Sequence, residues 1–190
     1  MATEQELSDF LKSVEKRAFK RAVWQVRDDD AALDIVQDSM LKLAQRYGDR
    51  PAQELPLLFQ RILANQTMDW FRRQKTRDAH LTSAADLISG DEEEGGPDAL
   101  EVLQAIAGAE AAAESAETSL SRREVLHLIE KALQELPARQ REAFLLRYWE
   151  ELDVAETAAV MGCSVGSVKT HCSRATQALA RTLQAQGISP

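Results

Sequence analysis

Along the first 80 residues, apolar side chains recur every three or four positions, which is the spacing of one helix face. The first helix has this stripe: Leu7, Leu11, Val14, Ala18 and Ala22. A second helix should begin after Asp28-Asp29-Asp30, because carboxylates stabilise a helix N-terminus, and end by Gly48 or Pro51. Its stripe is predicted to be Leu33, Val36, Met40 and Leu43. A third helix should run from about Leu57 to Lys75.

The C-terminal half shows the same spacing. Leu126, Ile129, Leu133 and Leu136 form one stripe, which Pro137 closes. Phe144, Tyr148 and Leu152 predict the next helix. No stretch alternates with period two, so the pattern predicts an all-α protein without a sheet.

Two short helices are predicted after Asp153. Asp153 and Glu156 have the spacing of a capping box, Gly162 suits the left-handed position after a helix, and Ser164 can cap the following helix. Two helices joined by a tight turn containing glycine are typical of a helix-turn-helix.

The second of these helices divides into two faces. Its buried stripe is predicted to be Val165, Val168, Cys172, Ala175 and Leu179. The opposite face is polar and cationic, with Ser167, Lys169, Thr170, Ser173, Arg174 and Gln177, and no acid occurs from Val165 to Pro190. Such a face can donate hydrogen bonds to base edges and phosphates in a major groove. The alternative is the solvated face of an ordinary helix.

Charge divides the chain into three parts. The net charge is −8, yet residues 1–80 and 120–190 each carry +1, and residues 81–119 hold ten acids and no Lys or Arg. The middle part combines a Gly- and Pro-containing acidic run with Ala-rich sequence, so we expect a flexible acidic linker. It would join two small helical domains that are marginal alone and suited to docking on a large partner.

A basic cluster ends the third predicted helix. Arg72, Arg73, Lys75 and Arg77 follow Trp70 and Phe71. Aromatic rings beside cations suit single-stranded or melted nucleic acid. The alternative is a core aromatic pair followed by a basic helix C-terminus, which the helix dipole also favours.

Other classes of protein find little support. Cys163, Cys172 and His171 are too few for a usual metal site, so we expect two ordinary thiols and no metal or cofactor. There is no glycine-rich phosphate loop and no catalytic constellation, so an enzyme is not expected. No secretory signal or membrane-spanning run is present, and the expected location is the cytoplasm.

Four segments together resemble the extracytoplasmic-function (ECF) sigma factors of the sigma-70 family. Residues 34–38 (DIVQD) and 62–73 (ILANQTMDWFRR) resemble region 2, and residues 136–144 (LPARQREAF) and 166–170 (GSVKT), with Arg174-Ala175, resemble region 4. The resemblance covers residues 5–78 and 120–185. It implies region 2 in residues 1–80, a linker over 81–119 and region 4 in residues 120–190.

The resemblance also implies site residues in region 2. Contacts to the clamp helices of the polymerase largest subunit are implied for Asp34, Gln37, Asp38, Leu41 and Lys42. Capture of a flipped base of the minus-ten element is implied for Asn65, with Tyr47 in the loop closing that pocket. Phosphate contacts are implied for Arg72 and Arg73, and we expect Lys75 and Arg77 of the same basic cluster to bind DNA as well. Gln66 and Thr67, beside Asn65, differ from the usual pattern and could change the preferred minus-ten sequence.

In region 4, the resemblance implies that the second helix of the helix-turn-helix reads the minus-thirty-five element. The residues implied are Lys169, Thr170, Ser173 and Arg174, with His171 near phosphate, and Ser167 and Gln177 of the same polar face are expected to bind DNA with them. The implied partners are core RNA polymerase, through its clamp helices and flap, promoter DNA, and an anti-sigma factor.

Two other classes of protein explain less of the sequence. A stand-alone helix-turn-helix regulator would leave residues 34–38 and 65–73 unexplained. An adaptor that binds only protein would leave the acid-free helix face unexplained.

Overall fold

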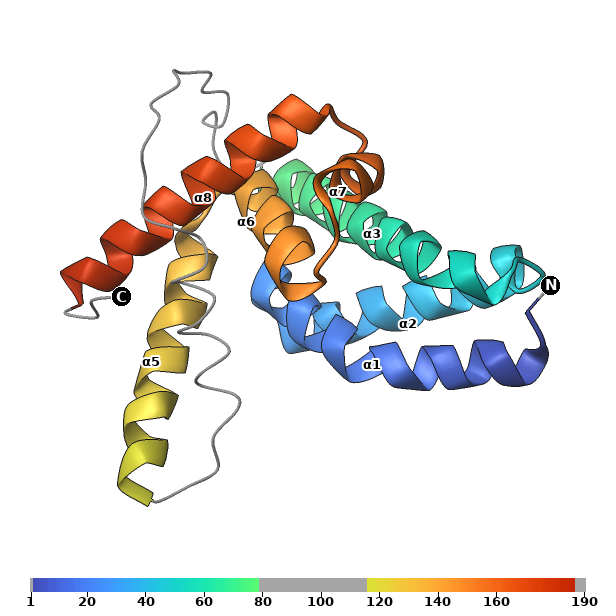
Figure 1. The fold of residues 1–190 in the computed structure, drawn as a ribbon, viewed down its shortest axis with the longest axis horizontal. Helices are drawn as coiled ribbons and strands as arrows, with labels where there is room; N and C mark the ends of the chain where they lie inside the picture. Colours follow the sequence, from blue (N-terminus) through green and yellow to red (C-terminus); the bar gives the residue numbers. More distant parts are fainter. Residues whose placement is uncertain (1, 79–115, 187–190) are drawn as a thin grey trace. The chain divides into compact units, whose positions relative to one another are not determined.

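The computed structural model describes residues 2–78 and 116–186. Two compact units make up the fold, one built mainly from the helices before residue 79 and the other mainly from those after residue 115 (Figure 1). The described residues form helices and no strand, so the predicted all-α fold class is confirmed. The acidic segment up to residue 115 lies outside the described residues.

The N-terminal unit is a bundle of three long helices. α1 (Glu4–Val26) begins at a capping box between Thr3 and Glu6, and ends at Arg27, whose φ of 60° is left-handed. α2 (Asp29–Tyr47) is capped by Asp28, which accepts a hydrogen bond from the Ala31 amide at 2.9 Å. After a 3-10 turn, η1 (Ala52–Glu54), α3 (Leu55–Asp78) packs against both α1 and α2.

The core of this unit is apolar with one buried charge. Phe59 of α3 is fully buried and meets Phe10 of α1 edge to face, with ring centroids 6.0 Å apart. Arg21 of α1 is also buried and donates a hydrogen bond to the Gln60 side chain of α3. This pair joins α1 to α3 because a buried guanidinium needs a hydrogen-bond partner.

The buried face of α2 differs from the predicted one. Leu33 is 44% exposed, whereas its neighbour Ala32 is completely buried, so the core face of α2 lies one position from the predicted one at this end. The buried set on α2 is Ala32, Ile35, Val36, Ser39 and Leu43. Ala32 and Ser39 are small residues, and the prediction was based on large apolar ones.

The C-terminal unit begins with α5 (Ala116–Glu135) and α6 (Ala138–Phe144), separated at Leu136-Pro137. Arg141 is buried and donates hydrogen bonds to three carbonyls at the end of α5, those of Leu133, Gln134 and Leu136, at 2.7–2.8 Å. It therefore satisfies acceptors that a helix C-terminus leaves without partners.

A π-helical turn, η2 (Leu145–Trp149), follows α6 directly. The Glu150 amide donates to the Leu145 carbonyl five positions earlier, at 2.9 Å. The predicted helix is present at Phe144 and Tyr148, as the end of α6 and the π turn, but Leu152 lies in the loop after it.

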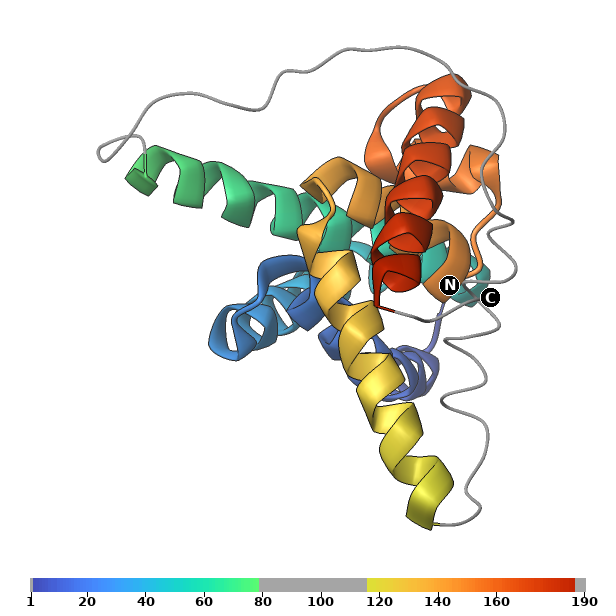
Figure 2. The ribbon, with the colours of Figure 1, turned by 90° about the vertical axis from the view of Figure 1, so that its left-hand side faces the viewer.

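The predicted tandem helices are α7 (Val154–Met161) and α8 (Val165–Ala185). The Asp153–Glu156 capping box is present, Gly162 has a φ of +64°, and Ser164 caps α8. α8 packs against α6 and α5 (Figure 2). Val168, Cys172, Ala175 and Leu179 are buried as predicted, but Val165 is 44% exposed. Val165 is the first residue of the helix, beyond the part that packs.

Candidate nucleic-acid interface

The outward face of α8 carries most of the residues predicted to read DNA. Lys169, Thr170 and Ser173 are exposed, and Ser167, Arg174 and Gln177 are half-buried. Thr170 donates its hydroxyl to the Gly166 carbonyl at 3.1 Å, which fixes the side chain. The arrangement presents hydroxyl and cationic donors along one side of the helix, opposite its buried stripe.

His171 lies at the edge of this face in a cationic environment. Its Nδ1 atom is buried and has no hydrogen-bond partner among the described residues. Burial lowers the pKa of His171, and the nearby charges of Arg139 and Arg174 lower it further. The ring is therefore neutral near pH 7, and the positive potential around it is suited to an anion such as a phosphate.

The two cysteines flank the start of α8 and differ in burial. Cys172 is buried, and burial raises the pKa of its thiol to about 11. Cys163 is half-buried, and burial raises its pKa as well. The prediction that Cys172 belongs to the buried stripe is confirmed, and both thiols are protonated at neutral pH. No cluster of potential metal ligands occurs within residues 2–78 and 126–186.

A second polar face lies on α3. Asn65 and Arg72 are exposed and share one side of the helix, with Arg61 one turn before Asn65. Sequence reasoning missed Arg61, although its spacing of four residues from Asn65 is a helical signal. Lys75 and Arg77 are also exposed, near the end of the helix. Trp70 and Phe71 are half-buried and meet edge to face, 5.1 Å apart, against the core of the unit.

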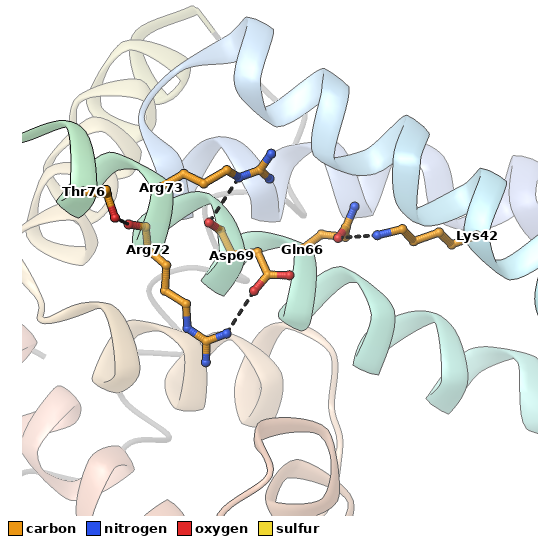
Figure 3. Close-up of polar contacts among 6 residues, drawn as sticks. All are labelled: Lys42, Gln66, Asp69, Arg72, Arg73 and Thr76. Carbon is orange, nitrogen blue, oxygen red and sulfur yellow. Dashed lines mark hydrogen bonds and ion pairs between the residues drawn. The ribbon is translucent and has the colours of Figure 1, made fainter.

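Arg72 and Arg73 point to different sides of α3 (Figure 3). Arg72 forms an ion pair with Asp69 at 3.0 Å, in which both side chains are largely exposed. Arg73 donates from Nε to the Asp69 carbonyl at 3.3 Å. The two adjacent guanidinium groups therefore point away from each other in this structure.

Lys42 reaches from α2 to α3 rather than outward. Its Nζ donates to the Gln66 Oε1 at 2.6 Å (Figure 3). Gln66 is only 7% exposed, and Thr67 is 3% exposed and donates its hydroxyl to the Leu63 carbonyl at 2.8 Å. Both side chains are thus held inside the unit, and neither is presented to a base as the sequence suggested.

The exposed face of α2 carries the remaining predicted contacts. Asp34, Gln37 and Asp38 are exposed, and Leu41 is 54% exposed. Leu33 adds a second exposed leucine to this face. Two exposed leucines among acids give this face a mixed apolar and acidic character. Tyr47 is the last residue of α2 and packs against the core, so it does not lie in a loop.

Comparisons with known proteins find sigma factors. Residues 126–179 match the family described as "Sigma-70, region 4". The chain is 26% identical to the RNA polymerase sigma-H factor of Pseudomonas aeruginosa, over 95% of this chain and 94% of that one. It is also 26% identical to the sigma factor SigV of Bacillus subtilis, over 90% and 87% of the two chains.

A solved structure extends the likeness to the fold. The sigma factor RpoE of Bartonella quintana, in complex with the anti-sigma factor NepR, matches with a TM-score of 0.61 and 25% identity, covering 95% of this chain and 96% of that one. The chain belongs to the sigma-70 family. Within that family it is an RNA polymerase sigma factor of the ECF type. No described helix has the length and apolar character needed to cross a membrane.

Proposed function

We propose that this sigma factor docks on core RNA polymerase through the exposed face of α2 and reads two promoter elements, through α8 and α3. The chain performs no chemical step itself in this role. It positions DNA on the polymerase and stabilises the melted strand, in the cytoplasm where polymerase works. The observation that carries the proposal is the outward face of α8, within the segment that matches sigma-70 region 4.

The minus-thirty-five element is assigned to α8. Lys169, Thr170 and Ser173 are exposed on one side of a helix that is anchored to α6 and α5 by its other side. A rigid helix with a polar outer face can enter the major groove, where lysine and hydroxyl groups donate to base edges and phosphates. The absence of acids from Val165 onward removes repulsion from the DNA backbone.

The minus-ten element is assigned to the exposed face of α3. The Asn65 side chain is exposed and offers both donors and an acceptor to the edge of an extruded base. Arg61 and Arg72 lie one and two turns away on the same side, where they can hold the phosphates on either side of that base.

Core-dependent transcription tests the proposal. Purified chain should direct core polymerase to a small set of promoters selected from a randomised DNA library, and neither core nor chain alone should do so. Lys169→Ala with Arg174→Ala should abolish dependence on the minus-thirty-five element, and Asn65→Ala should lower open-complex formation. The control is Lys12→Ala, an exposed lysine of α1 outside both faces. Promoter-specific repression or activation by the chain without core would instead support a stand-alone regulator.

An anti-sigma factor is a further proposed partner. The Bartonella neighbour was solved bound to its anti-sigma factor, and Leu33 and Leu41 give α2 an exposed apolar surface here. An inhibitor covering that surface would block polymerase docking. Leu41→Asp should weaken binding to core polymerase and to any inhibitor that copurifies with the chain, and tight core binding by Leu41→Asp would contradict the assignment of this surface.

A further inference from the structure

One lysine of the N-terminal unit is held in an unusual way. The Lys42 ammonium of α2 is bound to the side-chain oxygen of Gln66, at 2.6 Å, across the gap between α2 and α3. Gln66 is 7% exposed and immediately follows Asn65, the residue assigned to base capture. The contact therefore places a cation at the junction of α2 and α3, bonded to the residue next to Asn65 in the sequence.

The partner of Lys42 does not neutralise it. Gln66 supplies a neutral amide, and no carboxylate lies within ion-pair distance of Lys42 among residues 2–77. Arg72 differs, since Asp69 is 3.0 Å from its guanidinium. An ammonium has three donor hydrogens, so one bond to Gln66 leaves two for another acceptor.

The position of Lys42 on α2 also separates it from the face proposed to dock on polymerase. Asp34, Gln37, Asp38 and Leu41 form the exposed face of α2, whereas Lys42 is half-buried and directed towards α3. A residue whose charged end lies on α3 is poorly placed to bind a protein that docks on the outer face of α2.

We propose that Lys42 contacts a phosphate of the melted promoter strand, and that Gln66 is the positioning residue that holds its ammonium there. The inference rests on the proposed function and assigns Lys42 to DNA rather than to polymerase. Gln66 then influences promoter binding through Lys42, without touching a base. An amide suits this task because a carboxylate at position 66 would cancel the charge that the phosphate requires.

Salt dependence of promoter binding by the holoenzyme tests the proposal. Each phosphate contact with single-stranded DNA contributes about 0.7 to the slope of log affinity against log salt concentration. Lys42→Gln should weaken holoenzyme binding to a library-selected promoter by about threefold to tenfold at moderate salt and make the slope shallower by about 0.7. Lys42→Arg should keep the wild-type slope.

Two further variants examine the role of Gln66. Gln66→Met keeps the size of the side chain but removes the acceptor, so promoter binding should weaken. The double variant with Lys42→Gln should bind no more weakly than Lys42→Gln alone, because the two residues act as one unit. The matched control for charge removal is Lys12→Gln, which should retain the wild-type slope.

Affinity of each variant for core polymerase, measured in the absence of DNA, separates the outcomes. The proposal requires unchanged core affinity. Weaker core binding by Lys42→Gln with an unchanged salt slope would assign Lys42 to polymerase and overturn it. Wild-type promoter binding by Gln66→Met would overturn the positioning role. If the proposed function itself fails, the wild-type holoenzyme selects no promoter, which is seen before any variant is compared.

Discussion

At the scale of single residues, Asp69 limits what Arg72 can do. The ion pair between them spans 3.0 Å, and the two side chains are 50% and 79% exposed. Exposed pairs of this kind contribute only about 0–1 kcal/mol to stability. The carboxylate must give up its partner, or share it, when Arg72 binds a phosphate.

Replacement of Asp69 by Asn should therefore strengthen promoter binding. Asp69→Asn removes the competing charge and its repulsion of the DNA backbone, and it should change the free energy of unfolding by less than about 1 kcal/mol. We expect tighter holoenzyme–promoter binding at low salt, with the gain shrinking as salt rises. Weaker binding by Asp69→Asn would show that Asp69 orients Arg72 rather than competing for it.

His171 makes the free energy of unfolding of the chain depend on pH, in a direction that follows from its pKa. Burial first, and then Arg139 and Arg174, lower its pKa in the folded chain below the ordinary value of 6.5. The unfolded chain therefore binds the proton more readily. The contribution of neutral His171 to the free energy of unfolding is therefore fully present above about pH 6.5. It is lost as the pH falls below that value.

His171→Gln should remove this pH-dependent contribution to the free energy of unfolding. The free energy of unfolding of the wild type should fall more steeply than that of His171→Gln as the pH decreases from about 7 towards 5, the range in which an ordinary histidine titrates. Chemical denaturation at several pH values measures both. Parallel curves would show that His171 is equally easy to protonate in the two states.

Prediction of the buried residues from the sequence failed where small side chains pack in the core. Helical spacing identified Val36, Leu43, Val168 and Cys172 correctly as buried. It selected Leu33 and Val165, which are exposed, because a hydrophobic residue at the edge of a stripe fits the spacing as well as one at its centre. Ala32 and Ser39 are fully buried, and nothing in their chemistry distinguishes them from exposed small residues.

At the scale of elements, the turn between α7 and α8 depends on one glycine. Gly162 has a φ of +64°, and a Cβ added there would meet nothing within 4 Å. A side chain at this position would thus be strained by the backbone alone, without any clash. Gly166, in the first turn of α8, has ordinary helical geometry and room for a Cβ.

The two glycines should respond to alanine with opposite signs. Gly162→Ala should destabilise the chain by about 1–2 kcal/mol, the cost of a left-handed conformation for a residue with a Cβ. Gly166→Ala should stabilise it by up to about 1 kcal/mol, since alanine favours helix over glycine. Denaturant unfolding measures both, and a stabilising Gly162→Ala would contradict the turn geometry.

The ends of helices could be predicted from the sequence where a capping residue lies at the end itself. Asp28, Asp153, Gly162 and Ser164 each mark a helix end, because the signal lies in the residue itself and its nearest neighbours. The π turn at Leu145–Trp149 was missed, since its sequence is as apolar as an ordinary helix. The Lys42–Gln66 bond was missed as well, because it joins two helices 24 positions apart in the chain.

At the scale of the whole molecule, charge separates the parts proposed to read DNA from the excess acidity. Residues 1–80 and 120–190 each carry a net charge of +1, and residues 81–119 carry −10. Neither helical part carries a large net positive charge, so we expect few counterions to be released from DNA by the chain alone.

The isolated chain should therefore bind promoter DNA weakly. In a gel-shift assay, a promoter selected by the holoenzyme should shift with holoenzyme at concentrations where the chain alone gives no specific shift. Competition with unrelated DNA provides the control. A tight and sequence-specific shift by the chain alone would show that polymerase is not needed to present the two DNA-reading faces.

The acidic segment supplies a second test at this scale. Replacing the acids of residues 91–114 with Ser or Gln should weaken initiation if their charge substitutes for nucleic acid on the polymerase. Abortive and full-length transcripts, measured against the wild type, report the effect. Equal yields of both would leave this segment the role of a tether only. The segment's charge was evident from sequence, whereas its conformation lies outside the described residues.

The π turn after α6 has a consequence for how chains of this family can vary in length. A turn closed over five positions, as from Leu145 to Glu150, contains one residue more than an α-helical turn. Removing one residue between Phe144 and Glu150 would let the backbone close as an ordinary helix, and every residue after it could keep its place. Insertions and deletions among relatives should therefore gather at this turn, and alignments that place gaps inside α6 or α8 instead would misassign the residues proposed to read DNA.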